Sequence, residues 1–117
     1  MPRLMSVSLT EDAVRARRKT VTRRMGWLTL TPGTRLTLCR KVMGRKAGEP
    51  LVRIVDVEVL DVRRERLAFI SPEDVEAEGF SDMSPEAFVE FFCRSHKGCT
   101  PDTFVTRIRW RYPDDAQ

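Results

Sequence analysis

Residues 51–63 form the longest strand pattern in the chain, and its apolar alternation changes phase partway along. Ile54 and Leu60 lie on one parity, whereas the three valines between them lie on the other. Because successive side chains of a strand point to opposite faces of a sheet, this change of phase requires a bulge or a sharp bend. Small barrels use such bends to close. The pattern therefore predicts a curved sheet with a bend at Val55 and Asp56.

Shorter strand patterns occur near both ends of the chain and in its middle, at residues 5–8, 36–42 and 103–112. A Pro-Gly turn at 31–33 precedes the middle one, and a Gly- and Lys-rich connection at 44–50 follows it. Helical patterns are inserted between these strands. This order predicts an α+β barrel, and the pattern alone leaves its topology open.

The last of these strands alternates without interruption. One parity carries Ile108, Trp110 and Tyr112, and the other carries Arg107, Arg109 and Arg111. Because the outer face of a barrel is polar, we expect the three arginines to form a solvated exterior. A track that holds phosphates is the alternative.

Two Ser-Pro pairs predict the starts of two helices, since a Ser N-cap followed by Pro at the first helical position is a common helix start. A glycine follows each pattern, so we expect helices over residues 72–78 and 85–97. The aromatic stripe of the second helix should face the core, and it consists of Phe88, Phe91 and Phe92. The acidic side chains that should complement the dipole of the first helix or lie in solvent are Glu73, Asp74 and Glu76.

A third helix is predicted over residues 9–17. Ser8 and Glu11 have the spacing of a capping box, in which the hydroxyl and the carboxylate each satisfy a backbone N–H. The last turn of this helix is rich in arginine, which complements the negative end of the helix dipole. The most polar segment of the chain, residues 18–24, therefore begins at a helix terminus.

Residues 18–24, Arg-Lys-Thr-Val-Thr-Arg-Arg, contain four cations and two hydroxyls. The β-branched residues in this segment end the helix and favour an extended strand or a loop. Lys19, Thr20, Thr22 and Arg24 are the polar side chains that we expect to line a site. In an extended segment Lys19 and Thr22 lie on opposite faces, so a turn at the helix end is needed to bring them together.

A chain of 117 residues is expected to form one domain, 1–117, with 113–117 as a disordered tail. With 41% hydrophobic and 32% charged residues, and no apolar run near the ~20 residues that span a bilayer, no membrane role is expected. No secretion signal is recognisable at the N-terminus, so we expect a cytoplasmic protein. A monomer is favoured.

The net charge of +4 is distributed unevenly. Up to Arg66 the chain has 16 basic against 7 acidic residues, and beyond it 5 against 10. A basic half of this kind suits phosphates. For any single arginine, a solvated surface position is the alternative interpretation.

Three cysteines and one histidine raise the question of a metal site. Cys93 and His96 share a helix face, Cys99 follows the next turn, and Cys39 is a possible fourth ligand. Paired Cys-x-x-Cys knuckles are absent. We therefore favour reduced structural thiols over zinc, and expect no metal and no cofactor.

The 18–24 segment is followed by Gly26-Trp27 and, further along, by three more short motifs. These are Leu36-Thr37-Leu38, Ile70-Ser71-Pro72-Glu73-Asp74 and Ala77-Glu78-Gly79-Phe80. In this order and spacing they resemble the ASCH family, in a small single-domain bacterial or phage form. The resemblance implies an α+β fold, a PUA-like small β-barrel of five or six mainly antiparallel strands with about three helices covering its openings.

The resemblance also implies a catalytic set. Some family members hydrolyse the acyl amide of N4-acetylcytidine, and their Lys-x-x-Thr and Glu pattern falls here on Lys19, Thr22 and Glu78. Lys19 would then be the base, Thr22 the nucleophile and Glu78 the acid that protonates the leaving amine. The helix end at Glu78 disfavours an anion, which suits a proton donor. A structural ion pair with Lys19 or Arg24 explains an acid there equally well, and is favoured.

The hypothesis that we prefer is that the protein binds its partner without catalysing a reaction. In it the partner is RNA, a nucleotide or a modified nucleoside, recognised through its base and phosphates in a basic cleft. The expected contacts are Arg18, Lys19, Thr20, Thr22, Arg23, Arg24 and Trp27. Trp27 is more readily explained as a residue that packs against the core than as a stacking platform.

Overall fold

The computed structural model describes residues 3–113, so residues 114–117 of the expected tail lie outside it. The strands are β1 (Arg3–Ser6), β2 (Val21–Arg24), β3 (Arg35–Cys39), β4 (Arg53–Arg66) and β5 (Phe104–Arg111). The helices are α1 (Glu11–Arg15), α2 (Pro72–Ala77) and α3 (Pro85–Ser95), with short 3-10 turns η1 (Ser8–Thr10) and η2 (Leu67–Phe69). No helix among these residues is long and apolar enough to cross a membrane.

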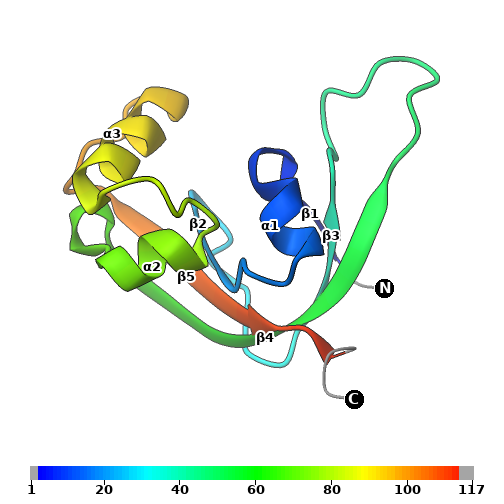
Figure 1. The fold of residues 1–117 in the computed structure, drawn as a ribbon, viewed down its shortest axis with the longest axis horizontal. Coiled ribbons are helices and arrows are strands. Elements are labelled where there is room, and N and C mark those ends of the chain that lie inside the picture. Colours follow the sequence, from blue (N-terminus) through cyan, green and yellow to red (C-terminus); the bar gives the residue numbers. More distant parts are fainter. Residues whose placement is uncertain (1–2, 114–117) are drawn as a thin grey trace.

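The five strands form one sheet in the order β1-β3-β4-β5-β2. β1 and β3 run parallel, and every other neighbouring pair is antiparallel. The sheet curls into a half-barrel around α1, while α2 and α3 lie together at one of its ends (Figure 1). The predicted α+β class, with five mainly antiparallel strands and three helices, is confirmed.

The long strand β4 has two register shifts. Against β3, Val55 pairs with Leu38 and Arg53 pairs with Cys39, which leaves Ile54 out of the pairing. The register of β4 against β5 shifts between Val59, which pairs with Trp110, and Asp61, which pairs with Arg109. Leu60 is the residue left out of the pairing. Because it adds one position, Val62 returns to the core face that Val59 occupies. The irregularity predicted at Val55 and Asp56 is therefore present one residue earlier, at Ile54, and the shift at Leu60 is a second one that was not predicted.

The two Ser-Pro helix starts are confirmed. The hydroxyl oxygens of Ser71 and Ser84 accept hydrogen bonds from the backbone N–H of Asp74 and Ala87, each at 3.1 Å. Both helices end slightly earlier than predicted.

The helix predicted over 9–17 is shorter, and its capping box is absent. A 3-10 turn occupies its first residues, and neither Val7 nor Thr10 at the N-caps makes a side-chain capping bond. The Glu11 carboxylate instead accepts hydrogen bonds from Arg15 and Arg40. Two strong cationic donors compete successfully with one backbone N–H for the same oxygens.

The buried residues form two separate hydrophobic clusters. The first fills the curve of the sheet, with Leu36, Leu38 and Trp110 among its members. The second joins α2 and α3 to β5, and includes Phe88 and Phe92. The candidate site lies where the two clusters meet.

Candidate functional site

A cavity of about 230 Å³ opens between β2, η1, the end of α2 and α3. One side of it is polar and consists of Lys19, Thr22, Arg23, Arg24 and Glu78. The facing side is aromatic and consists of Phe80, Phe88, Phe91, Phe92 and His96. Ser6, Ser8 and Thr10 line the remaining edge. We call this cavity the Lys19 pocket.

The backbone of Lys19 is fixed by two aromatic side chains of the sheet. Its carbonyl accepts hydrogen bonds from Trp110 Nε1, at 3.0 Å, and from the hydroxyl of Tyr112. These bonds hold the residue just before β2, at the point where the chain turns away from α1. Because Lys19 precedes β2, it is not restricted to the face of the strand opposite Thr22, and both residues can line the pocket.

The side chain of Lys19 is only 2% exposed. Its Nζ donates to the carbonyl oxygen of Glu78 at 2.6 Å and to Glu78 Oε1 at 3.2 Å. Burial lowers the pKa of Lys19, and the Glu78 carboxylate opposes part of this effect. The lysine is thus closer to its neutral form than a surface lysine would be.

Glu78 lies directly after α2 and is 3% exposed. Besides Lys19, its carboxylate meets Arg23 Nη1 at 3.4 Å. The structural ion pair expected with Lys19 is present. The second cation is Arg23 and not Arg24.

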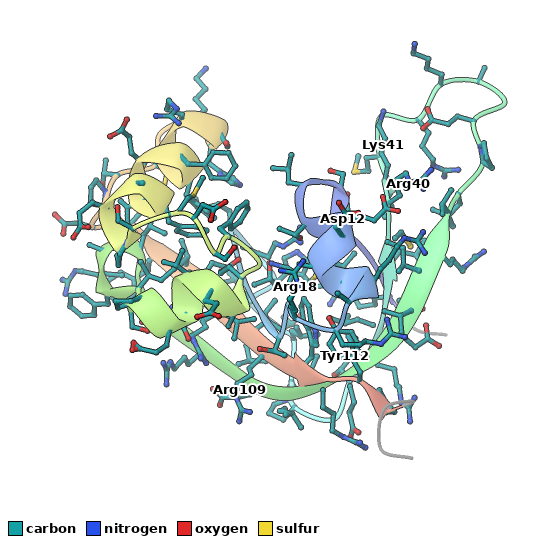
Figure 2. The ribbon with its side chains drawn as sticks, in the orientation of Figure 1. Asp12, Arg18, Arg40, Lys41, Arg109 and Tyr112 are labelled. Carbon is teal, nitrogen blue, oxygen red and sulfur yellow. The ribbon has the colours of Figure 1, made fainter. Side chains whose placement is uncertain are left out.

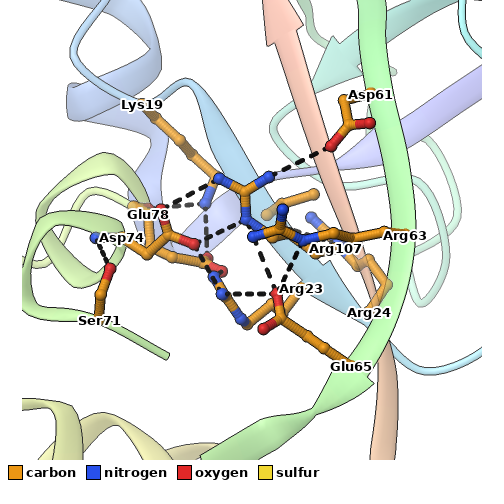
Figure 3. A network of polar contacts seen from close by, with 11 residues as sticks. Lys19, Arg23, Arg24, Asp61, Arg63, Glu65, Ser71, Asp74, Glu78 and Arg107 are labelled. Carbon is orange, nitrogen blue, oxygen red and sulfur yellow. Dashed lines mark hydrogen bonds and ion pairs between the residues drawn. The ribbon is translucent and has the colours of Figure 1, made fainter. Parts of the chain in front are cut away.

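Arg23 and Arg107 converge on Asp74 (Figure 3). Arg107 binds both carboxylate oxygens of Asp74, at 2.7 and 3.1 Å, and Arg23 Nη2 lies 2.6 Å from Oδ2. Glu65 accepts a further bond from Arg23 at 3.2 Å. Burial alone would raise the pKa of Asp74, but the hydrogen bonds from the two arginines lower it to about 2.

This network corrects two expectations from the sequence. Asp74 is not solvated surface, and Arg107 is buried instead of lying on an outer face. The reason is that α2 packs over the arginine side of β5 at this end of the sheet. Arg109 and Arg111, beyond the helix, are exposed as predicted, and Arg109 is labelled in Figure 2.

Thr22 is buried, and its hydroxyl oxygen accepts a hydrogen bond from Arg24 Nε at 3.1 Å. Arg24 Nη2 also donates to the carbonyl of Ser6 at 2.7 Å, which joins the two edge strands of the half-barrel. Within residues 3–113, Lys19 and Thr22 line the same pocket but share no hydrogen bond. The three residues of the implied catalytic set are nevertheless brought together.

Three predicted contacts lie outside the Lys19 pocket. Arg18 is exposed and lines a separate cavity of about 360 Å³ beside α1. Thr20 joins α2 to β5 through its backbone N–H and carbonyl. Trp27 packs against the core, and the guanidinium of Arg3 lies 4.2 Å from its ring centroid.

The sequence interpretation missed the aromatic side of the pocket. Phe91 was assigned to the buried stripe with Phe88 and Phe92, but it is only half-buried and faces the cavity. Phe88 and Phe92 are one helical turn apart and both face the core. Phe91 is rotated to one side of them on the helix, and this position indicates the border of the buried stripe. Phe80, in the expected Glu-Gly-Phe motif, packs against it in a tilted arrangement with ring centroids 5.6 Å apart.

The cysteines lie away from the polar side of the pocket. Cys93 Sγ is 3.7 Å from Cys99 Sγ, and Cys39 is buried in another part of the sheet. His96 stacks on Phe92 with ring centroids 4.1 Å apart, and its Nδ1 lies 2.9 Å from the Phe92 carbonyl. No group of three potential metal ligands comes together in the part of the chain that the structure describes.

No protein-family model and no curated protein matches this sequence. Solved structures do match the fold. The ASCH domain from Lactobacillus crispatus JV V101 is 18% identical with a TM-score of 0.62, over 89% of this chain and 70% of that one. Protein EF3133 from Enterococcus faecalis V583, of the family DUF984, is 14% identical with a TM-score of 0.66, over 96% and 80%. ASCH from Zymomonas mobilis is 13% identical with a TM-score of 0.59, over 92% and 65%. The chain therefore has the fold of the ASCH domain structures.

Proposed function

We propose that this protein is an ASCH module that binds a single nucleobase in the Lys19 pocket. The observation that carries the proposal is the pairing of a polar side with an aromatic one in a single small cavity. A base has a flat face that stacks on aromatic rings and an edge of donors and acceptors. Lys19, Thr22 and Arg24 offer partners for that edge, and Phe91 offers a face.

The size and the charges of the pocket favour one base over a longer strand. Its volume is below the roughly 300–1,000 Å³ typical of sites for drug-sized ligands. Lys19 and Arg23 bond carboxylates, so two of the cations expected to hold phosphates are already neutralised. A single nucleoside unit in a cytoplasmic pool, or one base flipped out of an RNA, fits this arrangement.

Calorimetric titration with cytidine and with a short single-stranded RNA, at several salt concentrations, tests this proposal. We expect saturable binding of cytidine that changes little with salt. A Phe91→Ala variant should weaken it at least tenfold, while a Phe69→Ala variant, which removes an exposed ring outside the pocket, should not. Failure of every nucleoside to bind, with RNA bound in a strongly salt-dependent way, would contradict it.

A second candidate function is hydrolysis of an N4-acylated cytidine. The observation that favours it is the buried Lys19, whose lowered pKa suits a general base, in one pocket with Thr22 and Glu78. In this mechanism neutral Lys19 exchanges one of its bonds to Glu78 for the Thr22 hydroxyl and takes its proton. Thr22 Oγ1 then attacks the acyl carbon.

The same contacts account for the remaining steps. The proton passes from Lys19 Nζ along its bond to Glu78 and on to the amine as the C–N bond breaks. Water then hydrolyses the acyl ester on Thr22, which releases the carboxylic acid and restores the hydroxyl. Arg24, whose Nε–H donates to Thr22 Oγ1, holds that oxygen in place, and its remaining N–H groups would stabilise the negative charge that develops on the acyl oxygen.

Incubation with N4-acetylcytidine and chromatography of the released cytidine tests this second function. We expect Lys19→Ala and Thr22→Val to release at least about 100-fold less cytidine than the wild type, and Thr22→Ser to retain part of the activity. An unchanged rate in Lys19→Ala, or no release by the wild type at high enzyme concentration, would contradict it. Nucleobase binding would survive the second result.

A further inference from the structure

The three cationic side chains of the Lys19 pocket, Lys19, Arg23 and Arg24, differ in whether a carboxylate lies beside them. Lys19 lies 3.2 Å from the Glu78 carboxylate, and Arg23 lies 2.6 Å from Asp74 and 3.2 Å from Glu65. Each therefore has at least one carboxylate at ion-pair distance, in a region that is closed to solvent.

Arg24 is the exception. Both of its hydrogen bonds go to uncharged oxygens, the Thr22 hydroxyl and the Ser6 carbonyl. Within residues 3–113 no carboxylate lies at ion-pair distance from it, because Glu78, the nearest acid of the pocket, is bound to Lys19 and Arg23. The guanidinium lines the cavity and keeps N–H donors that these two bonds do not use.

A cation that is taken out of water without an anion is costly. Arg24 is partly buried, and this burial lowers its pKa, which the more distant charge of Glu78 only partly opposes. Natural sites place guanidinium groups in such positions where a phosphate or carboxylate binds, because the planar group donates two parallel hydrogen bonds to it.

The rest of the pocket lining is compatible with an anion. Ser6, Ser8 and Thr10 are among the lining residues, and no acidic residue other than Glu78 lines the cavity. The charge of Glu78 is compensated by its two cationic partners. An entering anion therefore meets one uncompensated positive charge.

We propose that the ligand of the Lys19 pocket carries a phosphate group that binds Arg24, so that the pocket selects a nucleoside monophosphate over the nucleoside. This inference rests on the proposed binding of a nucleobase and names the chemical class of the ligand. In it the base stacks against Phe91, and the phosphate forms the ion pair that the chain itself leaves open at Arg24.

Calorimetric titrations with cytidine, cytidine 5′-monophosphate and inorganic phosphate, at one fixed ionic strength, test the proposal. We expect the monophosphate to bind at least tenfold more tightly than cytidine. Arg24→Gln should reduce this preference, taken as the ratio of the two affinities in the same variant, to less than about twofold, and Arg24→Lys should restore part of it. Arg109→Gln makes the same change of charge on the exposed side of β5 and should keep the full preference.

The outcomes separate the two proposals. Equal affinity for cytidine and its monophosphate would overturn the role of Arg24 and leave nucleobase binding intact. A tenfold preference that persists in Arg24→Gln would also overturn it. Binding of inorganic phosphate that depends on Arg24, without any binding of cytidine, would support the anion site and overturn the nucleobase proposal. No binding of any of the three compounds would overturn both. Because Arg24 also joins the edge strands, thermal unfolding of each variant checks that it is folded.

Discussion

Lys19 Nζ donates hydrogen bonds to both the carbonyl and the carboxylate of Glu78, which lies 59 residues later in the chain. The pair joins the residue before β2 to the residue after α2, and both residues line the pocket. Docking of α2 on the sheet therefore builds the site and buries its charges in the same step. A change at either residue is therefore expected to affect both stability and the proposed site.

The first prediction concerns the buried acid. Glu78→Gln removes the carboxylate from Lys19 and Arg23, whose side chains are 3% and 1% exposed. We expect a loss of about 3 kcal/mol in the free energy of unfolding, measured by urea denaturation, because two buried cations lose their partner. Glu76→Gln, an exposed position of the same helix, should stay within about 0.5 kcal/mol of wild type.

A double variant measures the interaction between Lys19 and Glu78 directly. Lys19→Met removes the cation that depends most on Glu78, so the double variant Lys19→Met/Glu78→Gln should lose less stability than the sum of the two single variants. If the loss of the double variant equals the sum of the two single losses, the interaction between Lys19 and Glu78 contributes nothing to stability, which would contradict the prediction.

The second prediction concerns acid stability. Because the pKa of Asp74 is about 2 in the folded state and 3.8 in the reference state, its contribution to stability is present above about pH 4 and is lost as the pH falls towards 2. The difference in unfolding free energy between wild type and Asp74→Asn should shrink by on the order of 2 kcal/mol over this range. Denaturation curves at several pH values measure it. Glu73→Gln, at an exposed position beside it, should show no such narrowing, and a constant difference for Asp74→Asn would refute the prediction.

The third prediction concerns the turn after Glu78. Gly79 has φ +103°, and a Cβ there would lie 3.0 Å from Ala13 Cβ and 3.1 Å from Thr10 Cγ2. Gly26, with φ +83°, has open space around it. We expect Gly26→Ala to cost about 1 kcal/mol for its backbone alone, and Gly79→Ala to cost about 3 kcal/mol because α1 and α2 must also separate. Equal losses would show that the close approach of the two helices does not matter.

The fourth prediction separates the two roles of the phenylalanines on α3. Phe88 is 2% exposed, and Phe88→Ala should cost about 3–5 kcal/mol of stability. Phe91 is half-buried at the pocket, so Phe91→Ala should cost less than about 1.5 kcal/mol while it weakens cytidine binding at least tenfold. The prediction fails if Phe91→Ala binds cytidine as the wild type does, or if it unfolds as easily as Phe88→Ala.

Local patterns were enough to predict much of this structure. The Ser71 and Ser84 caps, the buried parity of Ile108 and Trp110, and the extended 21–24 segment depend on residues that are close in sequence. The resemblance to ASCH domains also led to Lys19 and Glu78 as neighbours, which no local pattern shows.

The rest depended on how distant elements meet. In the sequence Asp74 is one of several acidic residues at the start of a predicted helix. It bonds Arg23 and Arg107 only because α2 packs on β5, and the local sequence does not show this contact. The position of the bulge at Leu60 is likewise set by pairing with β5. The Ser8 cap failed for the same reason, since Arg40 of a distant loop binds Glu11.

A crystal structure of the protein grown with cytidine tests the central claim most directly. The account predicts density for the base inside the Lys19 pocket, with its ring against Phe91 and its polar edge within hydrogen-bond distance of Lys19, Thr22 or Arg24. Cytidine bound elsewhere on the surface, with the Lys19 pocket empty, would contradict it.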